Sequence, residues 1–204
     1  MKIVILDGSL DSTPKSFMSY LDELRFTLEE NGHTVIHYPL KEMDIHYCIG
    51  CWDCWVKTPG QCVFDDDSRG INREIINADF LLFATPLVMG YASFVLKRKM
   101  DRIIPLIHPY ITLAENESHH RARYDKYPLV GLLMQKDVAD RDEDVFITSE
   151  IFARTALNLK SRLAFSATTD ESTRDLATRF ENLDSQHYRF NRNIPARVRD
   201  QISA

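Results

Sequence analysis

Every cysteine of this 204-residue chain lies in one short segment, at spacings that suit a single inorganic centre. The four residues are Cys48, Cys51, Cys54 and Cys62. A C-x2-C-x2-C run lets one loop place thiolates on successive corners of a [4Fe–4S] cubane. Zinc usually takes two separated cysteine pairs instead. Pro59 and Gly60 can turn the chain back, so that Cys62 completes the ligand set.

Two other interpretations of this cysteine segment stay open. Trp52 and Trp55 stand among the cysteines, and reduced thiols behave as small hydrophobic side chains that pack beside indoles without a metal. A zinc site or a redox disulfide is the other alternative. The two indoles could shield a cluster, fill its space or make a subunit contact. The spacing favours a cluster among these readings.

A second chemical signal lies near the start of the chain. Ile3–Leu6 is an apolar run typical of a parallel strand covered on both faces, and apolar residues then recur at helical spacing from 17 to 28. Between them stand the hydroxyl residues Ser9, Ser12, Thr13 and Ser16. A helix N-terminus offers free N–H groups and the positive end of its dipole, so this turn is a candidate phosphate site. Hydroxyl residues also cap helices, which is the plainer alternative.

A third segment follows the apolar run 80–84 and consists of Pro86, Leu87, Val88, Met89, Gly90 and Tyr91. The isoalloxazine ring of a flavin needs a flat apolar wall with backbone N–H and C=O groups near its heteroatoms. This loop offers that mixture, with Tyr91 to stack and Gly90 to allow close approach. An ordinary strand-to-helix turn is the alternative. Together with the phosphate turn, the segment predicts a site for FMN.

The order of elements places these segments at one edge of a sheet. Apolar strands at 3–6, 33–38, 80–84, 129–134 and 163–167 alternate with helices at 17–28, 65–78, 92–107, 145–159 and 176–183. This alternation predicts an α/β, flavodoxin-like three-layer sandwich with a five-stranded parallel sheet in the order 2-1-3-4-5. Residues 109–127 are expected to form a long irregular lid or interface loop, with His119 and His120 exposed.

Composition limits the class of protein. The chain has 44% hydrophobic and 27% charged residues and a net charge of -5, which fits one globular domain and excludes a basic nucleic-acid surface. No apolar run is long enough to span a membrane. The sequence starts directly with a strand and shows no signal peptide, so a cytoplasmic location is expected. The expected domain is 1–183, followed by a polar tail at 184–204.

Several segments together resemble a known family. They are Gly8-Ser9, the C-x-G-C-x-x-C run with Pro59-Gly60-x-Cys62, Asp65-Asp66, Ala84-Thr85-Pro86-Leu87 and Lys97-x-x-x-Asp101-Arg102. In these segments the chain resembles the NADPH-dependent FMN reductase and iron–sulfur flavoprotein group of the flavodoxin-like superfamily. The resemblance implies a non-covalent FMN and electron transfer from NAD(P)H to a small acceptor or to a [4Fe–4S] cluster. It also implies a homodimer or a higher homo-oligomer.

The resemblance assigns roles to particular residues. The phosphate role falls to Ser9, Ser12, Thr13 and Ser16, the ring role to Pro86, Leu87, Val88, Met89 and Gly90, and the cluster role to Cys48, Cys51, Cys54 and Cys62. Asp11 and Val88 depart from the family pattern, where a basic residue and an aromatic residue are usual. Two alternatives therefore remain: an electron carrier without its own substrate, and a non-redox binding module with a structural cysteine loop.

Overall fold

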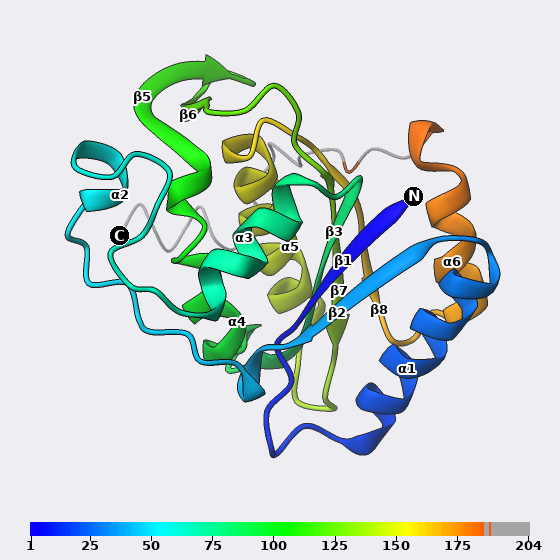
Figure 1. Cartoon of the computed structure of the whole chain (residues 1–204). Helices are drawn as coiled ribbons and strands as arrows, with labels where there is room; N and C mark the ends of the chain where they lie inside the picture. The colour runs from blue at the N-terminus through cyan, green and yellow to red at the C-terminus, as the bar shows by residue number, and fades with distance from the viewer. Residues whose placement is uncertain (186–187, 189–204) are drawn as a thin grey trace, which may run out of the picture.

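A parallel sheet forms the centre of the fold. The structure is a computed structural model that describes residues 1–185 and 188. Its main sheet has the strand order β2-β1-β3-β7-β8, with the short β4 paired to the end of β3 (Figure 1). The strands are β1 (Lys2–Asp7), β2 (Thr34–Pro39), β3 (Phe80–Val88), β4 (Tyr91–Ala92), β7 (Leu129–Gln135) and β8 (Leu163–Thr168). Counted by parallel strands alone, this is the order 2-1-3-4-5, so the flavodoxin-like prediction is confirmed.

Helices cover both faces of the sheet (Figure 1). They are α1 (Lys15–Glu30), α2 (Asp53–Val56), α3 (Asp67–Ile76), α4 (Phe94–Met100), α5 (Asp142–Asn158) and α6 (Thr173–Glu181), with 3₁₀ turns η1 (Leu40–Glu42), η2 (Ile104–Leu106) and η3 (Leu183–Ser185). Apolar residues of α1 and α6 pack on one face, and those of α3, α4 and α5 pack on the other. These are the three layers that the sequence predicts.

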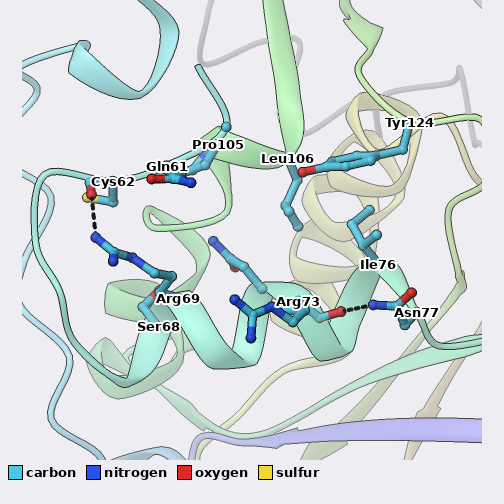
Figure 2. A pocket seen from close by; sticks show the side chains of 12 residues that line it. Gln61, Cys62, Ser68, Arg69, Arg73, Ile76, Asn77, Pro105, Leu106 and Tyr124 are labelled. Atoms are coloured by element: carbon cyan, nitrogen blue, oxygen red, sulfur yellow. Dashed lines mark hydrogen bonds between the residues drawn. The ribbon is translucent and has the colours of Figure 1, made fainter. Parts of the chain in front are cut away.

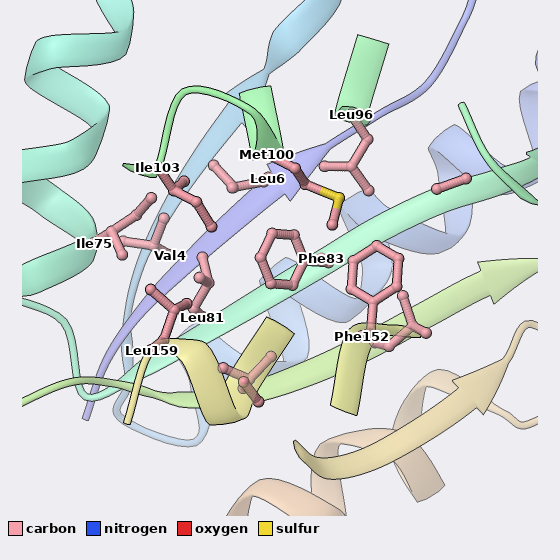
Figure 3. Packing of buried hydrophobic residues seen from close by; sticks show 14 of the residues in the cluster. Val4, Leu6, Ile75, Leu81, Phe83, Leu96, Met100, Ile103, Phe152 and Leu159 are labelled. Atoms are coloured by element: carbon pink, nitrogen blue, oxygen red, sulfur yellow. The ribbon is translucent and has the colours of Figure 1, made fainter. Parts of the chain in front are cut away.

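The strands are apolar on both faces because both faces are covered. Successive residues of a strand point to opposite sides, so Val4 and Leu6 enter one core cluster while Ile3 and Ile5 enter the other. Figure 3 shows the first cluster, in which Phe83 of β3 lies between the strands and the helices. The two cores hold the carboxyl ends of β1, β3 and β7 at one edge, where ligands of such sheets bind.

The segment after α4 differs from the prediction. The helix expected over 92–107 ends at Met100, and Pro105 lies in η2, because proline lacks the N–H that a continuing helix needs. The irregular loop expected over 109–127 is largely an antiparallel hairpin of β5 (Ile107–Ala114) and β6 (Glu117–Ala122). Its turn residues Glu115 and Asn116 both have positive φ, which fits a tight hairpin turn.

The histidine pair of this hairpin is also placed differently from the expectation. His119 is buried, and its Nδ1 lies 3.1 Å from Asn158 Oδ1 of α5. His120 is half-buried, with its Nδ1 2.8 Å from the carbonyl oxygen of His108. The expectation that both are exposed was therefore wrong, because the hairpin packs against α5.

Two further expectations concern the C-terminal tail and membrane-spanning helices. The expected polar tail, 184–204, lies outside the described residues except for Asp184, Ser185 and Tyr188. Among the described residues, no helix has the length and the apolar character needed to cross a membrane.

Candidate functional site

The ends of β1 and β3 are held together through Gly8. The Gly8 amide donates to the Ala84 carbonyl at 2.8 Å, and the Ser93 hydroxyl donates to the Gly8 carbonyl at 2.6 Å. A Cβ at Gly8 would lie 2.7 Å from Cβ of Leu96, which real side chains do not tolerate. Glycine is therefore required where the hydroxyl-rich turn leaves the sheet, and α4 fixes the position of that turn.

Ser9 points into the protein rather than toward solvent. Its amide donates to the Asp7 carboxylate at 2.8 Å and its hydroxyl donates to the same oxygen. The other Asp7 oxygen lies 3.1 Å from His37 Nε2. Burial acts to raise the pKa of Asp7, but the hydrogen bonds from His37 and Ser9 outweigh it, so this pKa is lowered. Sequence reasoning missed Asp7 as the residue that orders the turn, although an acid at the end of an apolar strand was a visible signal.

The rest of the turn leaves the start of α1 open. Thr13 is buried and its hydroxyl accepts from the Leu10 amide at 2.7 Å, whereas Ser12 and Ser16 are exposed. Proline occupies the N-cap position of α1, and no side chain in the described part of the chain caps this helix. Its first N–H groups therefore remain available to an anion. Asp11 is fully exposed and pairs with Lys41 at 3.3 Å.

The expected ring loop is a hairpin. β3 continues through Val88, Met89 and Gly90 form the turn with φ values of 53° and 79°, and β4 returns from Tyr91. The loop expected over 86–91 is therefore extended structure, because the strand does not stop at Ala84. Met89 at the tip is fully exposed, and a Cβ at Gly90 would lie 2.9 Å from Asp144 Oδ1 of α5. Tyr91 packs against the core, and this burial raises its pKa.

A cavity of about 170 Å³ brings the two predicted halves of the site together. Its walls are Leu10, Ser12, Thr13, Pro14, Pro86, Leu87, Val88, Gln135 and Asp137. Ser9, Ser16, Met89, Gly90 and Tyr91 do not line it. Two of its residues had no role assigned from the sequence: Gln135, the last residue of β7, and Asp137, which follows that strand.

The cavity carries an acceptor that the protein leaves unused. The side-chain oxygen of Gln135 is buried, and no donor among the described residues reaches it. Buried acceptors normally have a partner, so a ligand N–H suits this position. The open N-terminus of α1 suits the phosphate of a flavin mononucleotide. The apolar end of β3, with the free side-chain oxygen of Gln135, suits its ring.

The four cysteine thiols line one apolar pocket. All are free, and they share the pocket with the side chains of Ile49, Trp52, Val63, Phe64 and Ile104. Burial, followed by the proximity of the other three thiols, raises the pKa of Cys54 to about 11. Within the described ranges, no three Cys, His, Asp or Glu side chains are arranged as a ready metal site. The donor set fits a four-thiolate cluster, and the sulfurs would have to draw closer together to bind one.

Trp55 anchors the cysteine segment to the body of the fold. Its Nε1 donates to the carbonyls of Ile104 at 3.1 Å and Ile107 at 3.0 Å. Its ring stacks on Trp52, with ring centroids 4.7 Å apart. Trp52 has a φ of 61°, an uncommon conformation for a bulky residue. Trp55 thus positions the segment by hydrogen bonding, a role that was not among those considered from the sequence.

A second anchor joins the end of the cysteine segment to α4. The Arg102 guanidinium donates to both carboxylate oxygens of Asp66, at 2.8 and 2.9 Å, and to the His46 carbonyl at 2.6 Å. Arg102 follows α4, and Lys99 lies within that helix, is fully buried and donates to Asn72 at 2.6 Å. Burial and the neighbouring Arg102 lower the pKa of Lys99 to about 7. Sequence reasoning found Asp66 and Arg102 among the family matches and missed Lys99.

Comparison with known proteins gives a sequence match over the part of the chain that holds the hydroxyl-rich turn, the cysteine segment and the end of β3. The family model for NADPH-dependent FMN reductase matches residues 1–123. An iron–sulfur flavoprotein of Archaeoglobus fulgidus is 31% identical over 88 residues, which are 43% of this chain and 39% of that protein. An iron–sulfur flavoprotein of Methanocaldococcus jannaschii is 30% identical over 106 residues, 52% of this chain and 53% of that protein. The matches thus span about half or less of these curated relatives.

Solved structures extend the likeness of the fold over most of the chain. NAD(P)H:quinone oxidoreductase from Methanothermobacter marburgensis has a TM-score of 0.56 at 16% identity, covering 91% of this chain and 96% of the other. An FMN-dependent NADH-azoreductase from Bacillus anthracis, solved in complex with FMN, has a TM-score of 0.54 at 13% identity, covering 90% and 96%. At these identities the likeness shows the fold alone.

Proposed function

The chain belongs to the NADPH-dependent FMN reductase family, and on this premise we propose that it is an FMN-dependent oxidoreductase. It takes electrons from NAD(P)H onto non-covalent FMN and passes them to a small acceptor or to an iron–sulfur cluster. The observation that carries the proposal is the cavity that joins the hydroxyl-rich turn to the end of β3. It lies at the carboxyl edge of the sheet, between the first and third strands, where this fold binds ligands.

The cavity and the start of α1 beside it each have a role in holding the flavin. Ser12 in the cavity wall binds the phosphate through its hydroxyl, together with Ser16 in the first turn of α1 and the open backbone N–H groups of that helix. Leu87 and Val88 form the apolar wall for the ring, and Gln135 accepts an N–H. When bound, FMN supplies hydride and electron transfer, so the protein needs no nucleophile or general base of its own. The chain supplies binding, orientation and exclusion of water.

The cysteine pocket extends the proposal to a second redox group. Cys48, Cys51, Cys54 and Cys62 line one apolar pocket and would hold a [4Fe–4S] cluster as four thiolates. Such a cluster supplies one-electron transfer. Trp55 anchors the middle of the segment, and Arg102 anchors its two flanks at His46 and Asp66, which keeps the ligand set in place on the fold.

We also propose that the protein acts as a homo-oligomer. Apolar side chains are exposed on the β5–β6 hairpin, at Tyr110, Ile111 and Leu113, and on the cysteine segment, at Trp52 and Val56. Exposed apolar groups on neighbouring elements favour a protein interface. Light scattering coupled to size exclusion tests this point, and a monomer at micromolar concentration contradicts it.

The first experiment is the visible spectrum of protein purified without oxygen, with iron and sulfide assayed on the same sample. Flavin peaks with a broad shoulder near ~400 nm and about four irons per chain are expected for a protein with both groups. Steady-state oxidation of NADPH and NADH then separates an enzyme from an electron carrier. Flavin without iron would leave an FMN reductase with redox or packing thiols. Protein that binds no FMN on reconstitution refutes the oxidoreductase proposal.

A further inference from the structure

A larger cavity, of about 440 Å³, lies between α3, the end of the cysteine segment and the residues around η2. Figure 2 shows α3 as its floor, with Gln61 and Cys62 on one side and Leu106 and Tyr124 on the other. It shares no lining residue with the cavity at the phosphate turn. Cys62 lines both this cavity and the cysteine pocket, so the two are neighbours.

The charged side chains that line this cavity are all positive. Arg69 and Arg73 line it, and no aspartate or glutamate does. Arg69 pairs with the exposed Asp65 and donates to the Cys62 carbonyl, but its buried Nε has no acceptor in the described part of the chain. The Arg73 side chain has no ion-pair partner among the residues the structure describes. Guanidinium groups with unused donors suit a carboxylate or a phosphate.

The buried hydroxyl of Ser68 indicates an anionic ligand independently of the arginines. Ser68 lines the cavity and is 1% exposed, yet no residue of the described ranges forms a hydrogen bond with its hydroxyl. Buried polar groups are nearly always satisfied, and each exception needs an explanation. An anionic ligand between Ser68 and the arginines would satisfy this hydroxyl and the Arg69 Nε together.

Part of the lining is apolar. Leu106 and the ring of Tyr124 lie on the side away from Arg69, with Ile76 of α3 below them and Pro105 beside Gln61 (Figure 2). A pocket with an apolar wall and a few converging polar groups is typical of small-molecule sites. We propose that this cavity is a binding site for a small organic anion, with its carboxylate or phosphate on Arg69, Arg73 and Ser68 and a flat apolar body against Leu106 and Tyr124.

The test is calorimetric titration with 2-naphthoate, using full-length protein in the presence of saturating FMN so that the flavin cavity is filled. The neutral analogue 2-naphthamide and inorganic phosphate are titrated in parallel. We expect naphthoate to bind at least about tenfold more tightly than either, since 2-naphthamide lacks the charge and phosphate lacks the apolar body. Equal affinity for the amide or for phosphate overturns the proposal, and so does the absence of binding.

Variants locate the site. Arg73→Gln and Ser68→Ala are expected to weaken naphthoate binding by about tenfold and severalfold, respectively. Arg174→Gln, an exposed arginine of α6 on the other face of the sheet, removes the same charge and is expected to change nothing. If Arg73→Gln and Ser68→Ala both bind like the unaltered protein, the anion lies elsewhere. Flavin content, measured on the same samples, reports on the proposed function separately.

Discussion

Arg102, just after α4, and Asp66, the N-cap of α3, form a two-pronged ion pair in which both side chains are fully buried. Asp66 also accepts from the amides of His46 and Ser68, at 3.0 and 3.1 Å. Arg102 lies over the ring of Phe64 and binds the His46 carbonyl as well. One ion pair thus ties the residues on both sides of the cysteine segment to α3 and α4.

Breaking this ion pair is expected to destabilise the protein strongly. Asp66→Asn and Arg102→Met each leave the partner charge buried without its counter-ion, which costs about 3–5 kcal/mol. The double variant should lose less than the sum of the two single losses, because it buries no lone charge. Urea unfolding measures all three. Lys97→Met, which removes the exposed Lys97–Asp101 pair, is the control and should change stability by under about 1 kcal/mol.

The same pair makes stability depend on pH in the acid range. Burial acts to raise the pKa of Asp66, but the hydrogen bonds from Arg102 and His46 prevail and lower it below its ordinary value of 3.8. A carboxyl with a lowered folded pKa contributes its full stability above pH 3.8, and this is lost as the pH falls toward the folded pKa. The stability gap between the unaltered protein and Asp66→Asn should therefore stay constant above about pH 4 and narrow as the pH falls below it. A gap that does not change below about pH 4 contradicts this origin.

Gly8 offers a test of close packing at the flavin edge. An added methyl group would lie 2.7 Å from Cβ of Leu96 and 2.8 Å from the Ser93 hydroxyl, so Gly8→Ala should cost about 1–3 kcal/mol in the free energy of unfolding. Gly70→Ala is the matched control, since nothing lies within 4 Å of its added carbon. Gly70 is inside α3, where alanine should stabilise by about 0.5–1 kcal/mol. Thermal or urea unfolding should therefore show a lower free energy of unfolding for Gly8→Ala and a higher one for Gly70→Ala.

The phosphate role can be tested on one helix. Ser16 lies in the first turn of α1 and Ser19 one turn later, and both are exposed. Ser16→Ala removes a donor beside the open helix N-terminus and should weaken FMN binding by about five- to tenfold, whereas Ser19→Ala should leave it unchanged. Quenching of flavin fluorescence measures both dissociation constants. Equal affinities for the two variants would remove Ser16 from the proposed site.

The thiols should differ in reactivity when no metal is bound. Burial, with the three neighbouring thiols, raises the pKa of Cys54 to about 11, so this residue stays a thiol at pH 8 and becomes a thiolate only as the pH nears 11. Cys48 and Cys51 are exposed. Iodoacetamide at pH 8, followed by peptide mass spectrometry, should modify those two before Cys54. Iron and sulfide should slow the modification of all four if a cluster forms.

The sequence was sufficient to predict the elements of the fold where the local apolar pattern agrees with burial in the folded protein. Apolar runs such as Ile3–Leu6 predicted strands that are buried on both faces, and the alternation with helices predicted the sheet order. It was insufficient over 92–127, where the pattern was interrupted by Pro105. The hairpin there forms because its strands pair with one another and pack on α5, which periodicity along one segment does not reveal.

For the site, the residue types were visible in the sequence, but the residues that each of them contacts in the folded protein were not. The hydroxyl turn, the end of β3 and the four cysteines were all recognised from residue type and spacing. Only the tertiary structure turned Ser9 inward onto Asp7, placed Gln135 beside the hydroxyl-rich turn and joined Asp66 to Arg102. The physical reason is that backbone pattern depends on near neighbours, whereas burial and hydrogen-bond partners depend on residues far apart in the chain that the packed core brings together.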